Sequence, residues 1–553
     1  MIRLFNSLSQ RKEEFVPREP GKVGIYCCGP TVYNLVHIGN ARPYVIFAVL
    51  RSWLRRRGFE VTLVENITDV DDKIINKAQA EGRSADEVAR EFTVEYRRDT
   101  GRLGSALRPD LEPLATETIP EIINLCETLV ARGHAYEARG SVYFRVRSFA
   151  GYGKLSNQNI EELEEGVRVT GELGKEDPLD FAVWKAAKPG EPAWDSPWGK
   201  GRPGWHIECS AMGFKHLGAG FDIHGGGRDL IFPHHENEIA QSEAAGLPSP
   251  AYWLHNGMIR SEGEKMAKSV GNIFLLREVL DRYTGDEAQN DRLAANIVLT
   301  YFLTTHYRSP LEFSAEKLDE AKAAFSRLVN AVRTIDFRVA AAATPARTGT
   351  RSAAVPPAPA DTLPAATSPI PAGAPAGEAA DLRLRVDAVR ASFAEHMDDD
   401  LNTAAALGDV FSLIGDINRY LADVDRADKP LDNDALISAR DLIVDSCQAL
   451  LIDVDASAAL AEAESAGAGT SSSADGPAYQ SDSAMGVEPT VDEALAGWQE
   501  RLAAGDTRFA TVARDHYRAE KDWSKSDEIR DALQEAGYEV RDTKQGTQVV
   551  RKD

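Results

Sequence analysis

The chain has 553 residues, of which 43% are hydrophobic, and it carries five cysteines and a formal net charge of −23. This length leaves room for several domains with sizeable cores. We expect no membrane protein, because no run approaches the roughly 18 apolar residues of a membrane-spanning helix and the polar amino terminus is not a signal peptide. Five cysteines in so long a chain do not make a disulfide framework, which indicates a reducing, cytoplasmic setting.

The acidic balance argues against nucleic acid as a partner only on average, because binding depends on local basic patches. Three patches are present: Arg51 with residues 55–57, then Arg97, Arg98 and Arg102, and finally the tail over residues 541–552. Each is either a contact surface for nucleic acid or a solvated helix face, and the solvated face is favoured for any single patch.

The first part of the chain predicts a strand, a loop, a helix and a second strand, the unit that builds parallel sheets. The two strands are apolar runs at residues 23–28 and 61–67. The loop holds His37-Ile-Gly-Asn40, where the strand's carboxyl end meets the helix amino terminus, a place receptive to phosphate. Gly39 permits close backbone approach, and the His37 and Asn40 side chains add donors. Such a turn is also ordinary, so by itself it does not establish a nucleotide site.

Residues 1–110 predict the first half of an α/β sheet, and the pattern changes after them. Residues 111–200 begin with a helix at about 119–132 and continue with an alternating, strand-like run at 141–147. A stretch rich in Trp, Pro and Gly then covers 184–205. These features set residues 111–200 apart from the segment before them.

Residues 201–310 predict the second half of the sheet. A strand-like pattern at residues 221–224 ends in Gly225-Gly226-Gly227. A loop carrying Lys265-Met-Ala-Lys-Ser269 comes later, and an apolar helix at 291–305 follows it.

The rest of the chain predicts helices separated by two polar segments. Apolar residues at helical spacing place a helical bundle at 311–338 and 381–455. Between them, residues 339–380 are rich in Ala, Pro, Thr and Ser without periodicity, and we expect a disordered insertion there. A flexible linker is expected at 456–490. Within 491–553, a helix and a hairpin predict a small α+β module.

His37-Ile-Gly-Asn40 and Lys265-Met-Ala-Lys-Ser269 together resemble the HIGH and KMSKS signatures of the class I aminoacyl-tRNA synthetases. The segments IYCCGPTVYN, NITDVDDKI, GWHIECSAM, FDIHGGGRDLIFPHHENEIAQSEA and KMAKSVGN resemble the cysteinyl-tRNA synthetase family in particular. The resemblance covers most of residues 1–335 and returns at 381–455 and 491–553. It implies an α/β fold: a Rossmann-like parallel-sheet catalytic domain with a connective-peptide insertion, an α-helical bundle and a C-terminal anticodon-binding module.

The resemblance also implies a reaction and the residues that serve it. Cysteine would be activated with ATP, accompanied by Mg, to cysteinyl-adenylate and pyrophosphate, and then transferred to the terminal adenosine of tRNA(Cys). Asn40 replaces the second His of HIGH and Ala267 replaces the first Ser of KMSKS, and we expect altered rates without lost activity. Implied catalytic residues are His37, Asn40, Lys265 and Lys268, and implied ATP-binding residues are Gly39, Gly226, Gly227, Asp229, Lys268 and Ser269.

Possible metal ligands are spread along the chain. His234 and Glu238 are four residues apart on a predicted helix, so both project from one face, whereas Cys28 and Cys209 lie in separate segments. Spacing alone leaves a buried thiol pair and an ordinary His–Glu contact as the alternative. The resemblance implies that these four residues bind one zinc ion, while His235 is expected to orient a ligand or to be structural.

A metal would serve substrate selection, because cysteine and serine have nearly the same shape. Zinc binds a thiolate strongly and an alcohol poorly, so no editing domain is expected. Trp205 is expected either to wall the substrate pocket or to be a core residue. Thr68 either bonds the substrate or ends a strand.

The resemblance implies tRNA(Cys), L-cysteine and ATP as partners of a monomer. Single-stranded loops are read by stacking and hydrogen bonding, and the expected anticodon contacts are Arg518, Trp523, Asp527 and Asp542. The alternative for these four is a solvated helix with a packed tryptophan.

Two rival functions remain. One is an ATP-dependent ligase that joins cysteine to an amino sugar, for which an anticodon module has no use. The other is a non-catalytic tRNA- or zinc-binding protein, which predicts lost phosphate-contacting residues.

Overall fold

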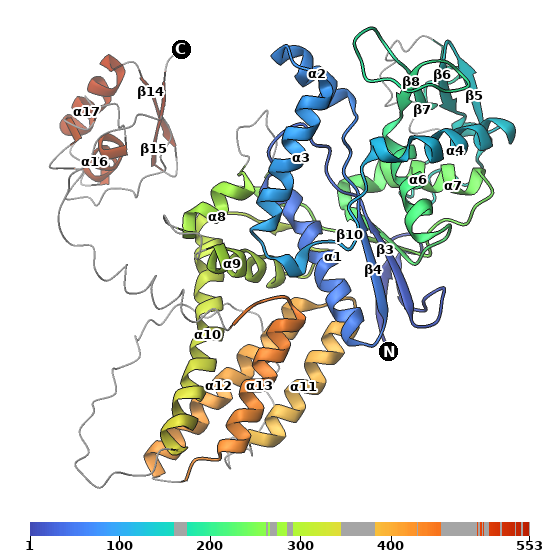
Figure 1. Ribbon diagram of the computed structural model, residues 1–553. Coiled ribbons are helices and arrows are strands. Elements are labelled where there is room, and N and C mark those ends of the chain that lie inside the picture. The colour runs from blue at the N-terminus through green and yellow to red at the C-terminus, as the bar shows by residue number, and fades with distance from the viewer. Residues whose placement is uncertain are drawn as a thin grey trace. The chain divides into compact units, whose positions relative to one another are not determined.

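The computed structural model of the chain divides into two compact units, Met1–Gly469 and Thr470–Asp553, and Figure 1 shows the elements of each. No helix in the described part is both long and apolar enough to cross a bilayer. The described residues are 1–159, 174–261, 264–265, 274–284, 291–343, 382–427, 430–454, 495, 498–499, 502, 508–519, 523–536, 538–543 and 546–551.

A four-stranded parallel sheet, ordered β10-β9-β3-β4, is the centre of the first unit. Its strands are β3 (Lys22–Cys27), β4 (Glu60–Glu65), β9 (Ile223–Gly227) and β10 (Tyr252–Asn256). Helix α1 (Ile38–Arg56) connects β3 to β4 and packs on the sheet. This arrangement confirms the predicted α/β class, and it brings four strand carboxyl ends to one edge, where such sheets bind ligands.

The glycine triplet lies inside strand β9, whose pairing continues beyond the predicted end at residue 224. Gly225 faces α1 so closely that a Cβ there would lie 1.9 Å from Cζ of Phe47. The strand can therefore press against α1 only because this position has no side chain.

Helices and short strands surround the sheet (Figure 1). After β4, a reciprocal cap starts α3: Glu87 N donates to Ser84 Oγ (3.2 Å) and Ser84 N to Glu87 Oε2 (3.0 Å). These surrounding elements are β1 (Arg3–Asn6), β2 (Arg11–Glu14), α2 (Asp72–Glu81), α3 (Ala85–Gly101), η1 (Ser105–Leu107), η2 (Ala115–Thr118), α6 (Trp205–Leu217), η4 (Arg228–Leu230), η5 (Ile231–His235) and α7 (Glu236–Ala244).

The insertion is an antiparallel sheet ordered β5-β6-β7-β8, covered by helix α4. Its elements are α4 (Ile119–Ala131), β5 (Ala135–Ala138), β6 (Ser141–Phe144), η3 (Val146–Ser148), β7 (Phe181–Ala186) and β8 (Gly201–Pro203). Both predicted limits of the insertion, 111 and 200, are corrected. Leu111 and Leu114 bridge to the β4 region of the catalytic sheet, and β8 lies beyond residue 200 because Pro203 pairs with Trp184 of β7.

A small sheet ordered β12-β11-β13 precedes the bundle. Since β13 pairs with β11, residues 311–312 belong to the catalytic part, although the bundle was predicted to begin at 311. The elements are β11 (Ile259–Ser261), β12 (Glu264–Lys265), α8 (Leu276–Thr284), α9 (Asp291–Leu303), β13 (Leu311–Glu312), α10 (Ala315–Ala343), α11 (Leu382–Asp398), α12 (Thr403–Ala427) and α13 (Asn433–Ala449).

The prediction of disorder from residue 339 is wrong for its first five residues, which continue α10 to Ala343. Four of these five are alanines, and alanine has the strongest helix propensity. The remainder, 344–380, lies outside the described residues, as does the linker at 456–490.

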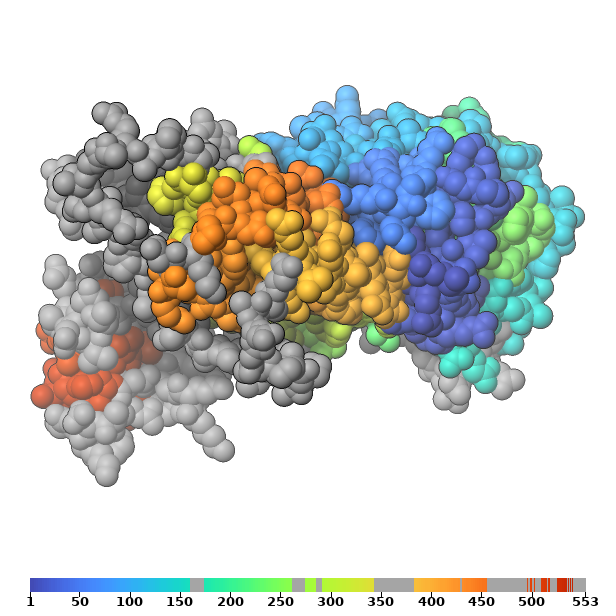
Figure 2. Space-filling view, turned by 90° about the horizontal axis from the view of Figure 1, so that it is seen from below, coloured from blue at the N-terminus to red at the C-terminus, as the bar shows by residue number. Residues whose placement is uncertain are grey.

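The bundle packs directly on the catalytic part, as the contact of its orange helices with the blue amino-terminal region in Figure 2 shows. Asp400, at the turn between α11 and α12, is fully buried there. Its carboxylate accepts hydrogen bonds from Phe5 N (2.8 Å), Tyr307 Oη (2.8 Å) and Arg308 Nε (2.7 Å). Because this carboxylate accepts from three donors in two distant segments, it holds the turn between α11 and α12 against the catalytic part.

The second unit contains α16 (Arg508–Ala519), α17 (Trp523–Glu535) and the hairpin β14 (Tyr538–Thr543) with β15 (Gly546–Arg551). A small apolar core between the helices includes Ala510, Ala513, Ile529 and Leu533. The observed hairpin agrees with the predicted one, with Thr543 paired to Gly546 across the turn.

Candidate active site and metal centre

A cavity of about 380 Å³ opens at the carboxyl edge of the parallel sheet. Sequence segments more than 200 residues apart meet there because four strands end at the same edge. Sequence-predicted residues that line the cavity are Cys28, His37, Gly39, Asn40, Thr68, Trp205, Cys209, Gly227, Asp229 and His234. Gly226 does not line it; a Cβ at this position would instead meet Leu230 and His235.

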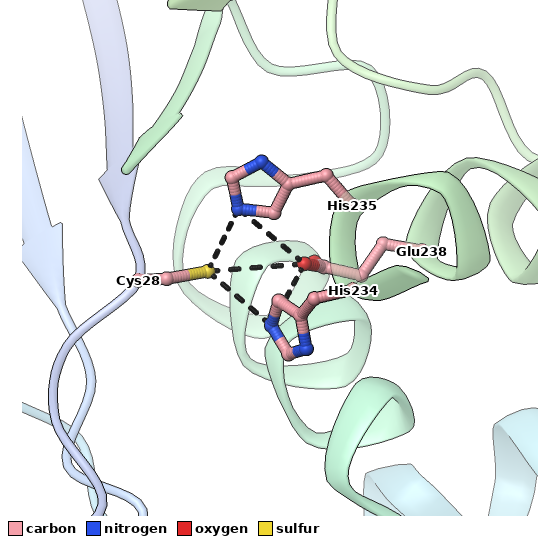
Figure 3. Close-up of side chains that lie close together, drawn as sticks. All are labelled: Cys28, His234, His235 and Glu238. Atoms are coloured by element: carbon pink, nitrogen blue, oxygen red, sulfur yellow. Dashed lines mark hydrogen bonds and ion pairs between the residues drawn. The ribbon is translucent and has the colours of Figure 1, made fainter. Parts of the chain in front are cut away.

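At one end of the cavity, a thiol, two imidazoles and a carboxylate converge (Figure 3). Cys28 follows β3, whereas His234, His235 and Glu238 project from the segment that joins η5 to α7. One ligand atom from each residue lies within 4.8 Å of all the others, and all four residues are buried. Cys209 Sγ lies 3.8 Å from Cys28 Sγ. Three of the four sequence-predicted metal ligands therefore belong to this cluster, and the fourth, Cys209, lies beside its Cys28.

The chemistry of these residues suits a divalent cation. Oε2 of Glu238 is buried and has no hydrogen-bond partner among the described residues. Burial raises the pKa of the Glu238 carboxyl and of the Cys28 thiol well above their ordinary values, because it disfavours their charged forms. Burial also lowers the pKa of His234 well below its usual value, which keeps this imidazole neutral, as metal binding requires. A cation would supply the missing compensation.

Two further histidines lie closer to this centre than the sequence predicted. His235 Nε2 is 3.3 Å from Cys28 Sγ, although His235 was expected to orient a ligand or to be structural. His224 Nε2 is 3.5 Å from both Cys28 Sγ and Glu238 Oε1, and it was not considered as a ligand. Its position on β9, directly before the glycines, is the signal that it faces the same edge as Cys28.

A hydrogen bond on the side away from the cluster sets the orientation of the His234 imidazole. His234 Nδ1 is 2.9 Å from His206 Nδ1, which turns Nε2 of His234 towards Cys28 and Glu238. On the cavity side, the Trp205 ring lies against His234, with ring centroids 4.3 Å apart. Trp205 thus lines the cavity next to the metal centre, and its place at the start of α6 is half-buried.

The other end of the cavity is built around the amino terminus of α1. His37 is the residue before the helix, and its backbone N–H donates to Asn40 Oδ1 at 3.2 Å. With the amide oxygen so engaged, the amide nitrogen of Asn40 is the group that can donate to a phosphate.

Backbone hydrogen bonds anchor the segment that follows the second signature beside the first. Lys265 ends β12, and the chain returns at Phe274, whose carbonyl accepts from Ile38 N at 2.9 Å. Leu276 N likewise donates to Val36 O at 2.9 Å. Lys268 and Ser269 lie outside the described residues, between these anchored ends.

Three carboxylates near the cavity were missed or left unassigned by sequence reasoning. Thr68 Oγ1 donates to Oε2 of the buried Glu208 at 3.2 Å. Glu65, at the end of β4, lines the cavity, and burial raises its pKa to about 8 although the Tyr96 hydroxyl donates to it. Asp69 accepts from Thr116 Oγ1 at 2.6 Å. Glu65 and Asp69 share a signal, their position at or just beyond the end of β4, whereas Glu208 lies in the first turn of α6.

Residues of the first two basic patches singled out in the sequence form ion pairs. These include Arg55 with Asp110 (2.9 Å), Arg56 with Asp445 (2.5 Å), Arg57 with Asp398 (3.0 Å), Arg97 with Glu112 (3.3 Å) and Arg102 with Asp281 (2.7 Å). Such pairing favours a structural role over contact with nucleic acid.

In the second unit, the side chain of Asp527 is exposed and pairs with Arg530 at 3.1 Å. The side chains of Arg518, Trp523 and Asp542 lie outside the described residues.

Comparisons with known proteins agree with the geometry. Residues 14–323 match the family model described as tRNA synthetases class I (C) catalytic domain, residues 392–450 the DALR domain, and residues 512–551 the cysteinyl-tRNA ligase anticodon binding domain. A cysteine–tRNA ligase of Pelotomaculum thermopropionicum is 43% identical, with 99% of each chain covered. One of Geobacter sulfurreducens is also 43% identical, covering 99% of this chain and 98% of that protein.

Among solved structures, the methionyl-tRNA synthetase of Mycobacterium tuberculosis in complex with methionyl-adenylate has a similar fold. The TM-score is 0.54 at 16% identity, over 78% of this chain and 90% of that one.

Proposed function

The chain belongs to the cysteinyl-tRNA synthetase family and is an ATP-dependent cysteine–tRNA ligase, and from this premise we propose how its own residues carry the reaction. L-cysteine binds at the Cys28 end of the cavity and ATP at the α1 end. Their reaction yields cysteinyl-adenylate and pyrophosphate, and cysteine then passes to the 3′-terminal adenosine of tRNA(Cys). The observation that carries this proposal is that a metal-competent cluster and a helix amino terminus open into one cavity.

Activation requires positioning and charge stabilisation more than acid–base chemistry. The amino terminus of α1, His37 and Asn40 donate to the phosphates from one side. Lys265 and Lys268 neutralise them from the other side, with Mg accompanying ATP. Gly39, Gly227, Asp229 and Ser269 complete the nucleotide site, with the Asp229 carboxylate suited to ribose hydroxyls, whereas Gly226 only lets the strand pack behind them.

Cys28, Cys209, His234 and Glu238 would hold one zinc ion. When bound, zinc supplies a coordination position that takes a thiolate far more readily than an alcohol, and a ten-thousandfold preference for cysteine needs about 5.6 kcal/mol. The chain's own residues orient the rest of the substrate. Thr68 Oγ1 donates to Glu208 Oε2 and accepts from Asn66 Nδ2, each at 3.2 Å, so its second lone pair is the acceptor for the substrate ammonium. Trp205 closes the side of the pocket and excludes water.

The second unit reads the anticodon of tRNA(Cys) in this proposal. Arg518, Trp523, Asp527 and Asp542 would contact splayed bases by stacking and hydrogen bonding. The match of residues 512–551 to an anticodon binding domain supports this role over that of an amino-sugar ligase, which has no anticodon to read.

Cysteine-dependent ATP–pyrophosphate exchange tests the proposal, with serine as the control substrate and zinc content measured on the same sample. We expect exchange with cysteine, none above background with serine, and one zinc per chain. His37→Ala should reduce exchange strongly while leaving zinc content unchanged. Unchanged exchange in that variant would show that His37 does not contact the phosphates, and charging of an amino sugar in place of tRNA would reassign the acceptor.

A further inference from the structure

A buried cation lies beside the nucleotide end of the cavity. Arg42 follows Asn40 by two residues in α1, and its side chain is completely buried. Among the described residues no carboxylate forms an ion pair with it, and its Nε has no hydrogen-bond partner. Burial lowers the pKa of Arg42 to about 10, so the guanidinium still carries its charge at neutral pH. Burying a charge without a counter-ion costs free energy of folding. The hydrogen bonds that the Arg42 guanidinium makes must offset that cost.

The guanidinium binds the backbone of the cavity wall. Nη1 of Arg42 donates to Gly257 O at 2.6 Å and, at a longer 3.4 Å, to Met258 O. Nη2 reaches His306 O at 3.4 Å. Both Gly257 and Met258 line the cavity. Gly257 and Met258 form a turn that packs tightly against the segment at 307–309. Gly257 N donates to Tyr307 O at 2.8 Å, and a Cβ on Gly257 would lie 2.2 Å from Ser309 O.

The turn at residues 257–258 also leads into the segment that carries Lys265 and Lys268, the second phosphate-binding arm. Strand β11 begins at Ile259, directly after Met258, and pairs with β12, which ends at Lys265. The first arm, His37 to Asn40, starts the same helix that carries Arg42. The Arg42 side chain therefore links the helix that begins at the first arm to the turn that precedes the second arm.

We propose that Arg42 is a positioning residue for ATP, which sets the separation of the two phosphate-binding arms by holding the 257–258 turn against α1. This inference rests on the proposed binding of ATP at this end of the cavity. The positive charge of Arg42 is not compensated by a carboxylate of the described residues, so it adds to the electrostatic potential that attracts the triphosphate.

Arg51 is a matched control on the same helix. It is 4% exposed, and its Nη1 and Nη2 donate to Arg108 O and Ala106 O, each at 2.6 Å. Asp110 lies 3.5 Å from Nη1, and none of these partners lines the cavity. Loss of Arg51 therefore removes comparable buried hydrogen bonds without touching the nucleotide site.

The test compares Arg42→Met, Arg42→Lys and Arg51→Met with the parent enzyme in pyrophosphate exchange, thermal unfolding and zinc content. For Arg42→Met we expect the KM for ATP to rise about tenfold, as for one lost charge-assisted hydrogen bond, with a lower kcat. The KM for cysteine and the zinc content should stay unchanged. Arg42→Lys should be intermediate, because lysine keeps the charge but not the fork of donors. Arg51→Met should lower Tm to a similar extent and leave the KM for ATP unchanged.

Equal changes in both KM values, or an Arg42→Met enzyme that behaves like Arg51→Met, would overturn the proposal and make Arg42 structural. Should Arg42→Met fail to fold, Arg42→Lys decides, since an unchanged KM for ATP in that variant contradicts the positioning role. Absence of cysteine-dependent exchange in the parent enzyme would instead refute the proposed function, so the two failures are distinguishable.

Discussion

Replacing Cys209 by alanine is expected to remove zinc from the protein, whereas replacing His235 by asparagine is not. With zinc about 2.3 Å from sulfur and about 2.0 to 2.2 Å from nitrogen or oxygen, a tetrahedral site places two sulfurs about 3.8 Å apart. The same geometry gives about 3.6 Å between sulfur and nitrogen and about 3.4 Å between nitrogen and oxygen. The structure has 3.8 Å for Cys28–Cys209, 3.5 Å for Cys28–His234 and 3.2 Å for His234–Glu238.

His235 also belongs to this centre, because its ligand atom lies within 4.8 Å of those of Cys28, His234 and Glu238, a group that does not include Cys209. Its Nε2 is 3.3 Å from Cys28 Sγ but 4.0 Å from Glu238 Oε1, longer than the roughly 3.4 Å expected for a nitrogen and an oxygen on one zinc ion, so we propose Cys209 as the fourth ligand. Structural zinc sites are stabilised by roughly 10 to 16 kcal/mol from four ligands, or about 3 kcal/mol for each. Loss of Cys209 should therefore weaken zinc binding by about a hundredfold or more. Loss of a residue that only orients ligands costs about tenfold to a hundredfold, and we expect His235→Asn at the lower end.

Zinc affinity can be measured by competition with a chromophoric chelator on the folded enzyme. Cobalt substitution gives an independent readout, since the thiolate-to-cobalt absorption falls when one of two sulfur ligands is lost. Cys126→Ala is the matched control, because Cys126 is equally buried but packs in α4 against Val183 O, away from the cluster. If His235→Asn loses more zinc than Cys209→Ala, the tetrahedral reasoning is refuted and His235 replaces Cys209 in the ligand set.

Three further predictions concern stability and tRNA. In the folded protein Glu65 keeps its proton up to about pH 8, whereas in the unfolded chain it releases the proton near pH 4.5. The free energy of unfolding should therefore fall as pH rises between these values, by up to about 5 kcal/mol. Glu65→Gln should flatten that fall in urea unfolding, and an unchanged slope would contradict the assignment. Gly225→Ala should lower stability by about 3 kcal/mol or more through its clash with Phe47, while Gly408→Ala, which meets nothing within 4 Å, should not lower Tm. Deleting residues 491–553 should weaken tRNA charging far more than cysteine activation, and equal loss of both would indicate that the tail only stabilises the fold.

Local patterns predicted the elements because their causes are local. The apolar run at residues 23–28 corresponds to strand β3, and the helical pattern after Asn40 corresponds to α1. Errors arose at element ends, as at residues 339–343, where alanine propensity extends α10 into a segment whose composition indicated disorder.

Partner choice among side chains was less accessible to sequence reasoning. For Arg55, Arg56 and Arg57 the sequence favoured a solvated helix face over a contact surface for nucleic acid, but it did not predict that each pairs with a carboxylate. The carboxylates come from positions as far away as Asp445, and no local pattern encodes a contact across 389 residues.

The sequence by itself determined the family and the parallel-sheet class, since signatures such as His37-Ile-Gly-Asn40 are contiguous and carry their chemistry in residue type and order. The four metal ligands that the resemblance implied stay a prediction. Only the tertiary structure decided that His224 and His235 approach the same thiol, and that Arg42 holds the turn beneath the second arm. These facts depend on where strand ends and helix faces meet in space. That meeting is set by packing across the whole core, so it cannot be read from any single segment.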